Sequence, residues 1–398
     1  MTRKRVVLLG LAALLTMSSV ASDGQHGAYI WAHLDGLEEQ EPPIALRHIP
    51  GASVLWASAP NSRDPLGSSS WGVWRVDLKL RDATRMGRAA PGSLDATVDA
   101  GEERAAWMLQ HDWAPRHDLI VWRATQPEPT AVASLDDGGL RTALSWSPGH
   151  ARVGWVYWRE PGTPGLRWWS AGSQDVTSVD LPPHSRPTRR APPIWMADGD
   201  EAGVLCREGM AGSYLPICSV RDQTWSAWGR RLDEGSKPED LLAPHEYRVL
   251  GRGVYEYAGQ PGIALLGSPD LMMVYRVLLT DEMRFMAPDP DPVGRPQADY
   301  SFVGPFVAPK VLSATRDRVA FVARTRGSGD WAIWVYTLNL PFNTTKAIPL
   351  PEGVPVHQQV AFGDSGEIYF VAGEPGNWRA MVANPEDGSI QEIAKLPR

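Results

Sequence analysis

Short apolar runs along the chain are separated by turns rich in Pro, Gly, Asp and Ser, and apolar and polar positions alternate within the runs. A period of two residues is typical of half-buried β-strands. The clearest case is 142–158, where the alternation continues on both sides of Ser147-Pro148-Gly149-His150. Because Pro and Gly supply turn dihedrals, this segment is predicted to be a hairpin. Strands at 166–170 and 176–181 would complete a four-stranded antiparallel unit.

Tryptophan recurs at nearly constant intervals. One series, with spacings of 51 and 48 residues, consists of Trp56, Trp107 and Trp155. A second, with spacings of 43, 48 and 46, consists of Trp31, Trp74, Trp122 and Trp168. Such self-similarity indicates stacked supersecondary units. Large flat side chains fill the space of about 10 Å between packed sheets, so we interpret most of the 18 tryptophans as packing residues.

The repeat predicts an all-β fold, a seven-bladed β-propeller of four-stranded antiparallel blades, with six or eight blades as alternatives. Second strands are predicted to begin near residues 53, 104, 152, 202, 252, 318 and 367. The widest interval contains 286–292, whose prolines predict an inserted extended loop. The strand 29–34 precedes the first unit. Because an open ring leaves unpaired edges, we expect this strand to pair into the terminal blade.

One repeat resembles that of a known family. Within 144–157, an aromatic residue is followed by a Ser-Pro-Gly turn and an apolar strand, and partial copies of this order begin at Trp195 and Phe362. The order is similar to the repeat of TolB-like β-propeller proteins, which implies a propeller fold. We expect no counterpart of the α/β domain that precedes the propeller in TolB, so the resemblance is not extended to the Tol envelope system.

Residues 1–21 have the pattern of a secretory signal peptide. A basic start, Arg3-Lys4-Arg5, is followed by an apolar run at 6–15 and by small residues around Ala21. The run is too short for a membrane span of roughly 20 residues; a retained N-terminal anchor is the alternative. We expect cleavage to leave 22–398 as a single propeller domain, monomeric and either periplasmic or secreted.

The charge balance narrows the classes of partner. The formal net charge is −7, and loss of the three basic signal residues lowers it to about −10. Phosphate contacts need clustered Lys and Arg, and after signal removal no basic run is longer than the one at Thr188-Arg189-Arg190. Nucleic acid is therefore not expected as a partner. No other segment reaches 18 consecutive apolar residues, so no membrane span is expected after signal removal.

Cys206 and Cys218 are the two cysteines of the chain. They flank a Gly-rich segment, 209–213, which is predicted to be a turn centred near Gly212. About that centre the two cysteines would lie opposite each other, within the reach of a disulfide in an exported protein. We therefore predict a structural disulfide between them, with two buried thiols as the alternative.

The sequence contains no Gly-x-Ser-x-Gly, P-loop or His-Glu-x-x-His motif, and no catalytic residue, metal ligand or cofactor is predicted. The most suggestive polar cluster is 111–118, which holds the pairs His111-Asp112 and His117-Asp118. Imidazole and carboxylate groups can bind a divalent metal, but a solvated turn explains the cluster equally well. The acidic residues at 198–201 and 289–291 have oxygen ligands for calcium as the alternative, but we interpret both segments as solvated turns.

Three tryptophans, Trp71, Trp113 and Trp225, are assigned to loops, where an indole can form a platform for sugars or peptides. Trp113 and Trp225 are the candidate binding residues. The function predicted is an exported noncatalytic propeller, a protein- or ligand-binding or scaffold module with an unknown protein or small ligand at the channel rim. The alternative is a propeller hydrolase or lyase with a carboxylate or metal site in the funnel. Such a site is assembled from several blades and needs no local motif.

Overall fold

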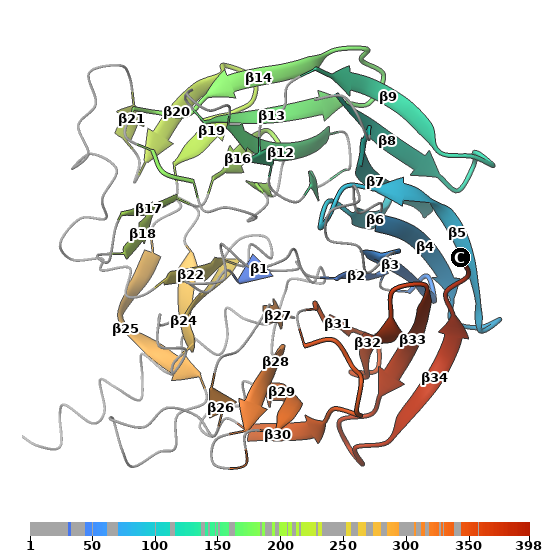
Figure 1. Ribbon diagram of the computed structural model, residues 1–398. Coiled ribbons are helices and arrows are strands. Elements are labelled where there is room, and N and C mark those ends of the chain that lie inside the picture. The colour runs from blue at the N-terminus through green and yellow to red at the C-terminus, as the bar shows by residue number, and fades with distance from the viewer. Residues whose placement is uncertain are drawn as a thin grey trace, which may run out of the picture.

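The computed structural model consists of short antiparallel β-strands (Figure 1). Among the residues that it describes, no helix is long and apolar enough to cross a membrane. The described residues are 31–32, 44–49, 51–61, 71–99, 101–111, 116–136, 140–141, 144–147, 149, 152–158, 164–183, 185–187, 193–195, 199–204, 206–208, 212–214, 216–227, 230–232, 252–255, 262–267, 274–279, 285–293, 306–307, 312–314, 318–325, 328, 330–337, 344–356 and 358–398.

Most sheets contain four or five strands that are close in the sequence. The first contains β2 (Ala45–Ile49), β3 (Val54–Pro60), β4 (Trp71–Asp77) and β5 (Asp82–Ala89). The next contains β6 (Asp95–Asp99), β7 (Glu102–Gln110), β8 (His117–Arg123) and β9 (Thr130–Leu135). It is followed by β10 (Leu140–Arg141), β11 (Ser145–Trp146), β12 (Arg152–Trp158), β13 (Gly165–Ser170) and β14 (Val176–Asp180).

The chain continues with β15 (Ile194–Trp195), β16 (Glu201–Gly203), β19 (Ile217–Ser219), β20 (Thr224–Ala227) and β21 (Arg230–Leu232). A separate hairpin is formed by β17 (Cys206–Glu208) and β18 (Gly212–Tyr214). The next sheet joins β1 (Trp31–Ala32) to β22 (Arg252–Tyr255), β23 (Gly262–Gly267), β24 (Val274–Leu279) and β25 (Phe285–Val293).

The last two sheets complete the chain. One contains β26 (Phe306–Val307), β27 (Leu312–Ala314), β28 (Arg318–Thr325), β29 (Trp331–Thr337) and β30 (Thr344–Pro349). The other contains β31 (Ala361–Phe362), β32 (Ile368–Glu374), β33 (Asn377–Ala383) and β34 (Ile390–Lys395). In Figure 1 the sheets follow one another around a common centre, and the red last sheet lies beside the blue first one.

The predicted starts of the second strands are confirmed to within two residues. In the structure β3, β7, β12, β16, β22, β28 and β32 begin at 54, 102, 152, 201, 252, 318 and 368. The hairpin predicted at 142–158 is also present, because Ser145 pairs with Gly154 and Trp146 with Val153. The two-residue period and the turn residues are local signals, so they locate strands without information about the rest of the fold.

The prediction that the repeated tryptophans are packing residues is confirmed for those whose side chains the structure describes. Trp56, Trp74, Trp107 and Trp155 are each at most 1% exposed. Trp56 on β3 packs against Trp107 on β7 with ring centroids 6.3 Å apart, so the indoles meet between neighbouring sheets. Each large aromatic side chain buries about 150–250 Å², so these indoles contribute much of the apolar surface that is buried between neighbouring sheets.

The seam between β12 and β15 requires a glycine. A Cβ on Gly154 would lie 2.6 Å from Trp195 Cζ2, closer than real Cβ contacts come. The same indole donates from Nε1 to the Ser145 carbonyl oxygen at 3.0 Å. The Trp195 ring is therefore positioned both by close packing and by a hydrogen bond.

The prediction that the early strand closes the terminal blade is wrong. Within 29–34 the structure describes β1, and it pairs with β22, where Trp31 is opposite Tyr255. The last sheet already has four strands of its own, because β31 pairs with β32. The first and last sheets meet directly instead: Ile44 forms a parallel bridge with Gln358, and the Gln359 amide donates to the Ile44 carbonyl oxygen at 2.9 Å.

The Pro-rich segment 286–292 is a strand and not the predicted loop. It belongs to β25, which lies at the edge of its sheet and pairs only with β24. An edge strand tolerates prolines because one side of its backbone needs no hydrogen-bond donors. The register shifts between Arg276 and Leu278 of β24, so the pairing includes an irregularity in the middle of the Pro-rich run.

Candidate functional site

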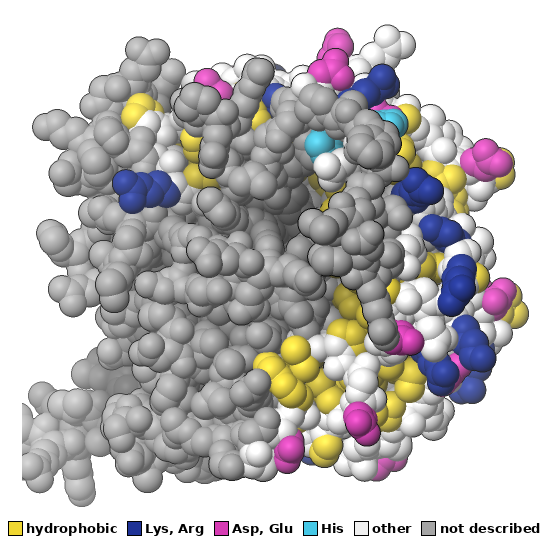
Figure 2. Space-filling model, viewed as in Figure 1, with side chains coloured by type: hydrophobic (Ala, Val, Ile, Leu, Met, Phe, Trp, Pro, Cys, Tyr) yellow, Lys and Arg dark blue, Asp and Glu magenta, His cyan; other side chains and the backbone are white. Residues whose placement is uncertain are grey.

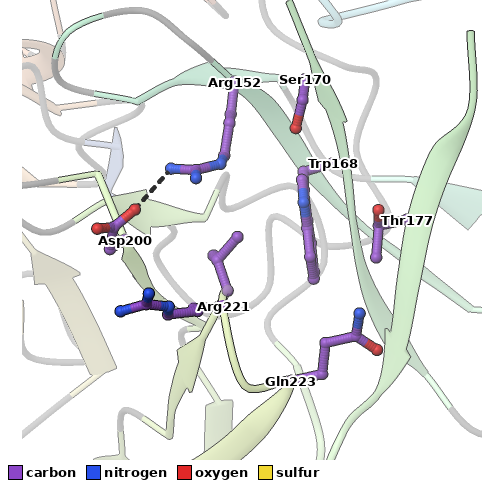
Figure 3. Close-up of a pocket in the computed structure, with 8 residues that line it drawn as sticks. Arg152, Trp168, Ser170, Thr177, Asp200, Arg221 and Gln223 are labelled. Carbon is purple, nitrogen blue, oxygen red and sulfur yellow. Dashed lines mark hydrogen bonds and ion pairs between the residues drawn. The ribbon is translucent and has the colours of Figure 1, made fainter. Parts of the chain in front are cut away.

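A pocket of about 460 Å³ lies between the sheet of β12–β14 and the turns of the following sheet (Figure 3). Residues from β12, β13 and β14 form one side, and the turns before β16 and after β19 form the other. Its lining consists of Arg152, Trp168, Ser170, Thr177, Asp200, Val220, Arg221 and Gln223.

Strand register brings the first side of the pocket together. Arg152 at the start of β12 pairs with Ser170 at the end of β13, and Trp168 on β13 pairs with Thr177 on β14. Trp168 and Ser170 are two residues apart, so they lie on the same face of the sheet. That face therefore presents an indole beside two hydroxyl groups.

The second side is formed by two turns. Gly199, with φ of +72°, precedes Asp200 before β16, and Gln223, with φ of +54°, ends the turn between β19 and β20. The Gln223 amide donates to the Ser219 carbonyl oxygen at 2.8 Å, which closes that turn. Local backbone geometry therefore positions Asp200, Arg221 and Gln223 at the pocket.

An ion pair links the two sides. Arg152 Nη1 donates to Asp200 Oδ1 at 3.0 Å and to the Gly199 carbonyl oxygen at 2.6 Å. The side chains of Arg152 and Asp200 are 24% and 60% exposed. Arg221 is exposed, and in the described part of the chain no ion pair or hydrogen bond engages its guanidinium. The pocket therefore combines a neutralised carboxylate with a cation that is available to a ligand.

Known proteins resemble this chain in fold and not in sequence. No family model matches the sequence, and no curated protein matches it. Among solved structures, TolB from Acinetobacter baumannii aligns over 87% of this chain and 83% of its own, at 12% identity and a TM-score of 0.42. A puromycin-hydrolyzing peptidase from Mycobacterium tuberculosis aligns over 90% of this chain at 12% identity and a TM-score of 0.51.

The β-propeller domain of the Trilobed protease from Pyrococcus furiosus aligns over 89% of this chain and 96% of its own, at 10% identity and a TM-score of 0.49. This chain has a β-propeller fold. This chain spans about half, 53%, of the length of the Mycobacterium peptidase. Identities this low show likeness of fold alone, so they assign no activity to the pocket.

Of the candidate binding tryptophans, Trp225 is not among the residues that line this pocket, and Trp113 is outside the described residues. Trp225 is in β20 and Trp71 is in β4, so their assignment to loops is wrong. Trp225 is 6% exposed and donates from Nε1 to the Asp180 carbonyl oxygen at 2.8 Å across the seam. A binding role for either Trp113 or Trp225 stays a prediction.

The His-Asp cluster at 111–118 is partly assembled. His111 Nε2 lies 2.8 Å from Asp118 Oδ2, while Ser134 Oγ donates to Asp118 Oδ1 at 2.6 Å. Arg116 Nε donates to the same carboxylate at 3.3 Å. Burial alone would raise the pKa of Asp118, but these three hydrogen bonds outweigh it and lower the pKa. Within the described residues, no group of three or more His, Cys, Asp or Glu side chains is arranged to hold a metal ion.

The cysteines do not stand opposite each other, and no disulfide joins them. Cys206 pairs with Tyr214 and Cys218 pairs with Ala202, so the hairpin is centred at residue 210 and not at 212. Cys218 on β19 therefore lies four residues beyond Tyr214, the partner of Cys206 on β17, and the two cysteines belong to different sheets. Burial, with the nearby Glu201, raises the pKa of the Cys218 thiol to about 12.

The acidic turns predicted from sequence have different positions in the structure. Asp198 lies outside the described residues, and Asp200 is held by Arg152 in the pocket. Asp289 and Asp291 lie on β25, whose side chains are not described. Sequence reasoning missed the pocket, although Arg152 and Asp200 are 48 residues apart and this interval matches the repeat. Charge pairing at the repeat interval was the signal that could have indicated it.

Proposed function

We propose that this propeller is a noncatalytic binding module and that the pocket between β12–β14 and the following sheet takes a small polar ligand with an anionic group. The pocket itself carries the proposal. Arg221 contributes a cation that no described side chain neutralises, and an Arg guanidinium binds carboxylates and phosphates with several donors in a fixed geometry.

The remaining lining residues suit the neutral part of such a ligand. Ser170 and Thr177 offer hydroxyl groups and Gln223 offers an amide, each of which can donate and accept hydrogen bonds. Trp168 and Val220 add apolar surface beside them. A few placed polar groups around an apolar wall are the usual composition of a small-molecule site. Asp200 is already bound to Arg152, so it forms part of the pocket wall.

The proposal includes a blade number and a location for the protein. Seven regularly placed second strands support a propeller of seven four-stranded blades. The signal-peptide pattern of residues 1–21 supports export to the periplasm or beyond the cell. In that setting a soluble binder would meet small metabolites of the envelope.

Calorimetry with two matched probes tests the pocket. D-glucuronate carries a carboxylate and several hydroxyl groups, whereas methyl glucoside has similar hydroxyl groups and no charge. We expect glucuronate to bind more tightly, and we expect Arg221→Gln to weaken that binding about tenfold or more, because charge-assisted hydrogen bonds contribute roughly 1.5–3 kcal/mol.

Two controls make the result specific. Arg85→Gln removes an exposed cation on β5, outside the pocket lining, and should leave glucuronate binding unchanged. Gln223→Ala should weaken the binding of both probes. Absence of glucuronate binding, or binding that is insensitive to both Arg221→Gln and Gln223→Ala, would contradict the proposal.

A further inference from the structure

The turn between β4 and β5 holds a leucine out in solvent. Leu80 is 77% exposed, and it is the one large hydrophobic side chain among those described that is exposed. Asp77 Oδ1 accepts hydrogen bonds from the backbone amides of Lys79 at 2.9 Å and Leu80 at 2.8 Å. Arg81 has φ of +54°, in the left-handed region. The tip is therefore a defined turn that presents an apolar side chain between two cations.

Further cations continue from this tip along the outer strands. We call this surface the β5–β34 rim; it consists of Leu80 and the exposed basic residues Lys79, Arg81, Arg85, Arg88, Lys395 and Arg398. Figure 2 shows Lys and Arg side chains gathered along this side of the molecule, over the positions of β5, the C-terminus and β34 in Figure 1. The indole of Trp74 on β4 donates to the Pro397 carbonyl oxygen at 2.7 Å, which ties the segment after β34 to the first sheet.

The acidic residues of this surface are fewer than the basic ones, and most of them already accept hydrogen bonds from the protein itself. The Asp77 carboxylate accepts a hydrogen bond from the backbone amide of Leu80, and the Glu392 carboxylate accepts one from the Arg379 guanidinium at 3.0 Å. Asp82 is the exposed acid beside the tip. In the neighbouring turn, Asp387 is exposed and Glu386 accepts from Lys346. The rim thus has a basic excess on a chain whose formal net charge is −7.

We infer that the β5–β34 rim docks this propeller reversibly on an anionic phospholipid surface. Basic side chains near such a surface are attracted by its negative potential, and an apolar side chain between them can enter the headgroup boundary. A soluble polyanion would use the cations equally well but would gain nothing from Leu80. The inference is independent of the pocket, because no pocket residue belongs to the rim.

Vesicle co-sedimentation of the full chain tests the rim. We expect binding to vesicles that contain phosphatidylglycerol, loss of binding as salt is raised, and no binding to pure phosphatidylcholine vesicles. Each cation near the surface contributes about fivefold in affinity, so Arg81→Gln with Arg85→Gln should weaken binding roughly 25-fold. Leu80→Asn should weaken it severalfold without altering its salt dependence. All these positions are exposed, so the variants should keep the melting temperature of the parent.

A matched control removes two exposed cations outside both the rim and the pocket, Arg116→Gln with Arg186→Gln, and should leave vesicle binding unchanged. Absence of binding to anionic vesicles, or equal losses in the rim and control variants, would overturn the inference. Binding to heparin that matches vesicle binding and ignores Leu80→Asn would also overturn it, because it would identify a soluble polyanion as the partner.

Discussion

Arg47 and Asp95 form a largely buried ion pair across the seam between the first two sheets. Arg47 Nε donates to Asp95 Oδ1 at 2.8 Å, and the side chains are 2% and 16% exposed. Arg47 Nη1 also donates to Gln359 Oε1 at 2.6 Å, and Asp95 Oδ2 accepts from the Trp146 amide at 2.9 Å. These residues lie on β2, on β6, just before β31 and on β11, so one polar network connects successive sheets around the ring.

Replacing Asp95 by Ala should lower the free energy of unfolding by about 3–5 kcal/mol, because it leaves the guanidinium of Arg47 buried without its carboxylate. Urea denaturation measures the change. The double variant Arg47→Met with Asp95→Asn removes the buried charge and keeps an oxygen for the Trp146 amide, so it should lose less than Asp95→Ala alone. A double variant less stable than Asp95→Ala would show that the network does not act as described.

Adding a methyl group at Gly154 tests the close approach of the indole. Gly154→Ala should destabilise the protein by roughly 1–3 kcal/mol, because the new Cβ would overlap Trp195 in a packed seam. Trp195→Phe shortens the ring and makes room. The combined loss in the double variant should therefore be smaller than the sum of the two single losses in urea denaturation; simple additivity would argue against the contact.

Thiol accessibility follows from the burial of the two cysteines. Both cysteines are buried and not joined, and the pKa of Cys218 is raised to about 12, so we expect iodoacetamide to modify the folded protein slowly. Unfolding without a reductant should expose two reactive thiols per chain. Mass spectrometry counts the modifications, and a chain that gains none until it is reduced would mean that the disulfide forms after all.

The Asp118 cluster should make stability depend on acid pH. The pKa of this carboxyl is lower in the folded protein than in the unfolded chain, so its stabilising effect is complete above the unfolded value, about 3.9, and is lost as pH falls through the folded value. At neutral pH Asp118→Asn should cost about 1–3 kcal/mol. Urea denaturation at decreasing pH should show the two proteins converging; a constant difference would contradict the assigned hydrogen bonds.

The sequence predicted the features of this propeller that are local. Strand starts, the hairpin at 142–158 and the buried Trp series follow from period, turn residues and spacing, all of which act within one unit. The disulfide prediction failed because a shift of the hairpin centre by two residues moves each cysteine away from the other. Glycine content suggested Gly212 as the centre, whereas pairing across the whole hairpin determines it.

Features that depend on contacts between units were not predictable from this pattern. The partner of the 29–34 strand was misassigned because period and composition do not specify which edge a short strand joins. Trp225 was placed in a loop because its flanking residues are polar, although its indole is buried against the neighbouring sheet. The pocket brings together two sheets, so its residues carry no motif within either unit.

The first and last sheets contact each other directly and so close the ring, and an engineered disulfide between them tests this closure. Ile44 and Gln358 are Cα partners in a parallel bridge, so cysteines introduced at both positions should cross-link under mild oxidation. Circular dichroism of the two single variants shows first that each folds, and Ile44→Cys with Gln223→Cys serves as the distant control. We predict a 44–358 linked peptide by mass spectrometry in the first pair alone. Folded variants that form no such link would contradict the closed ring.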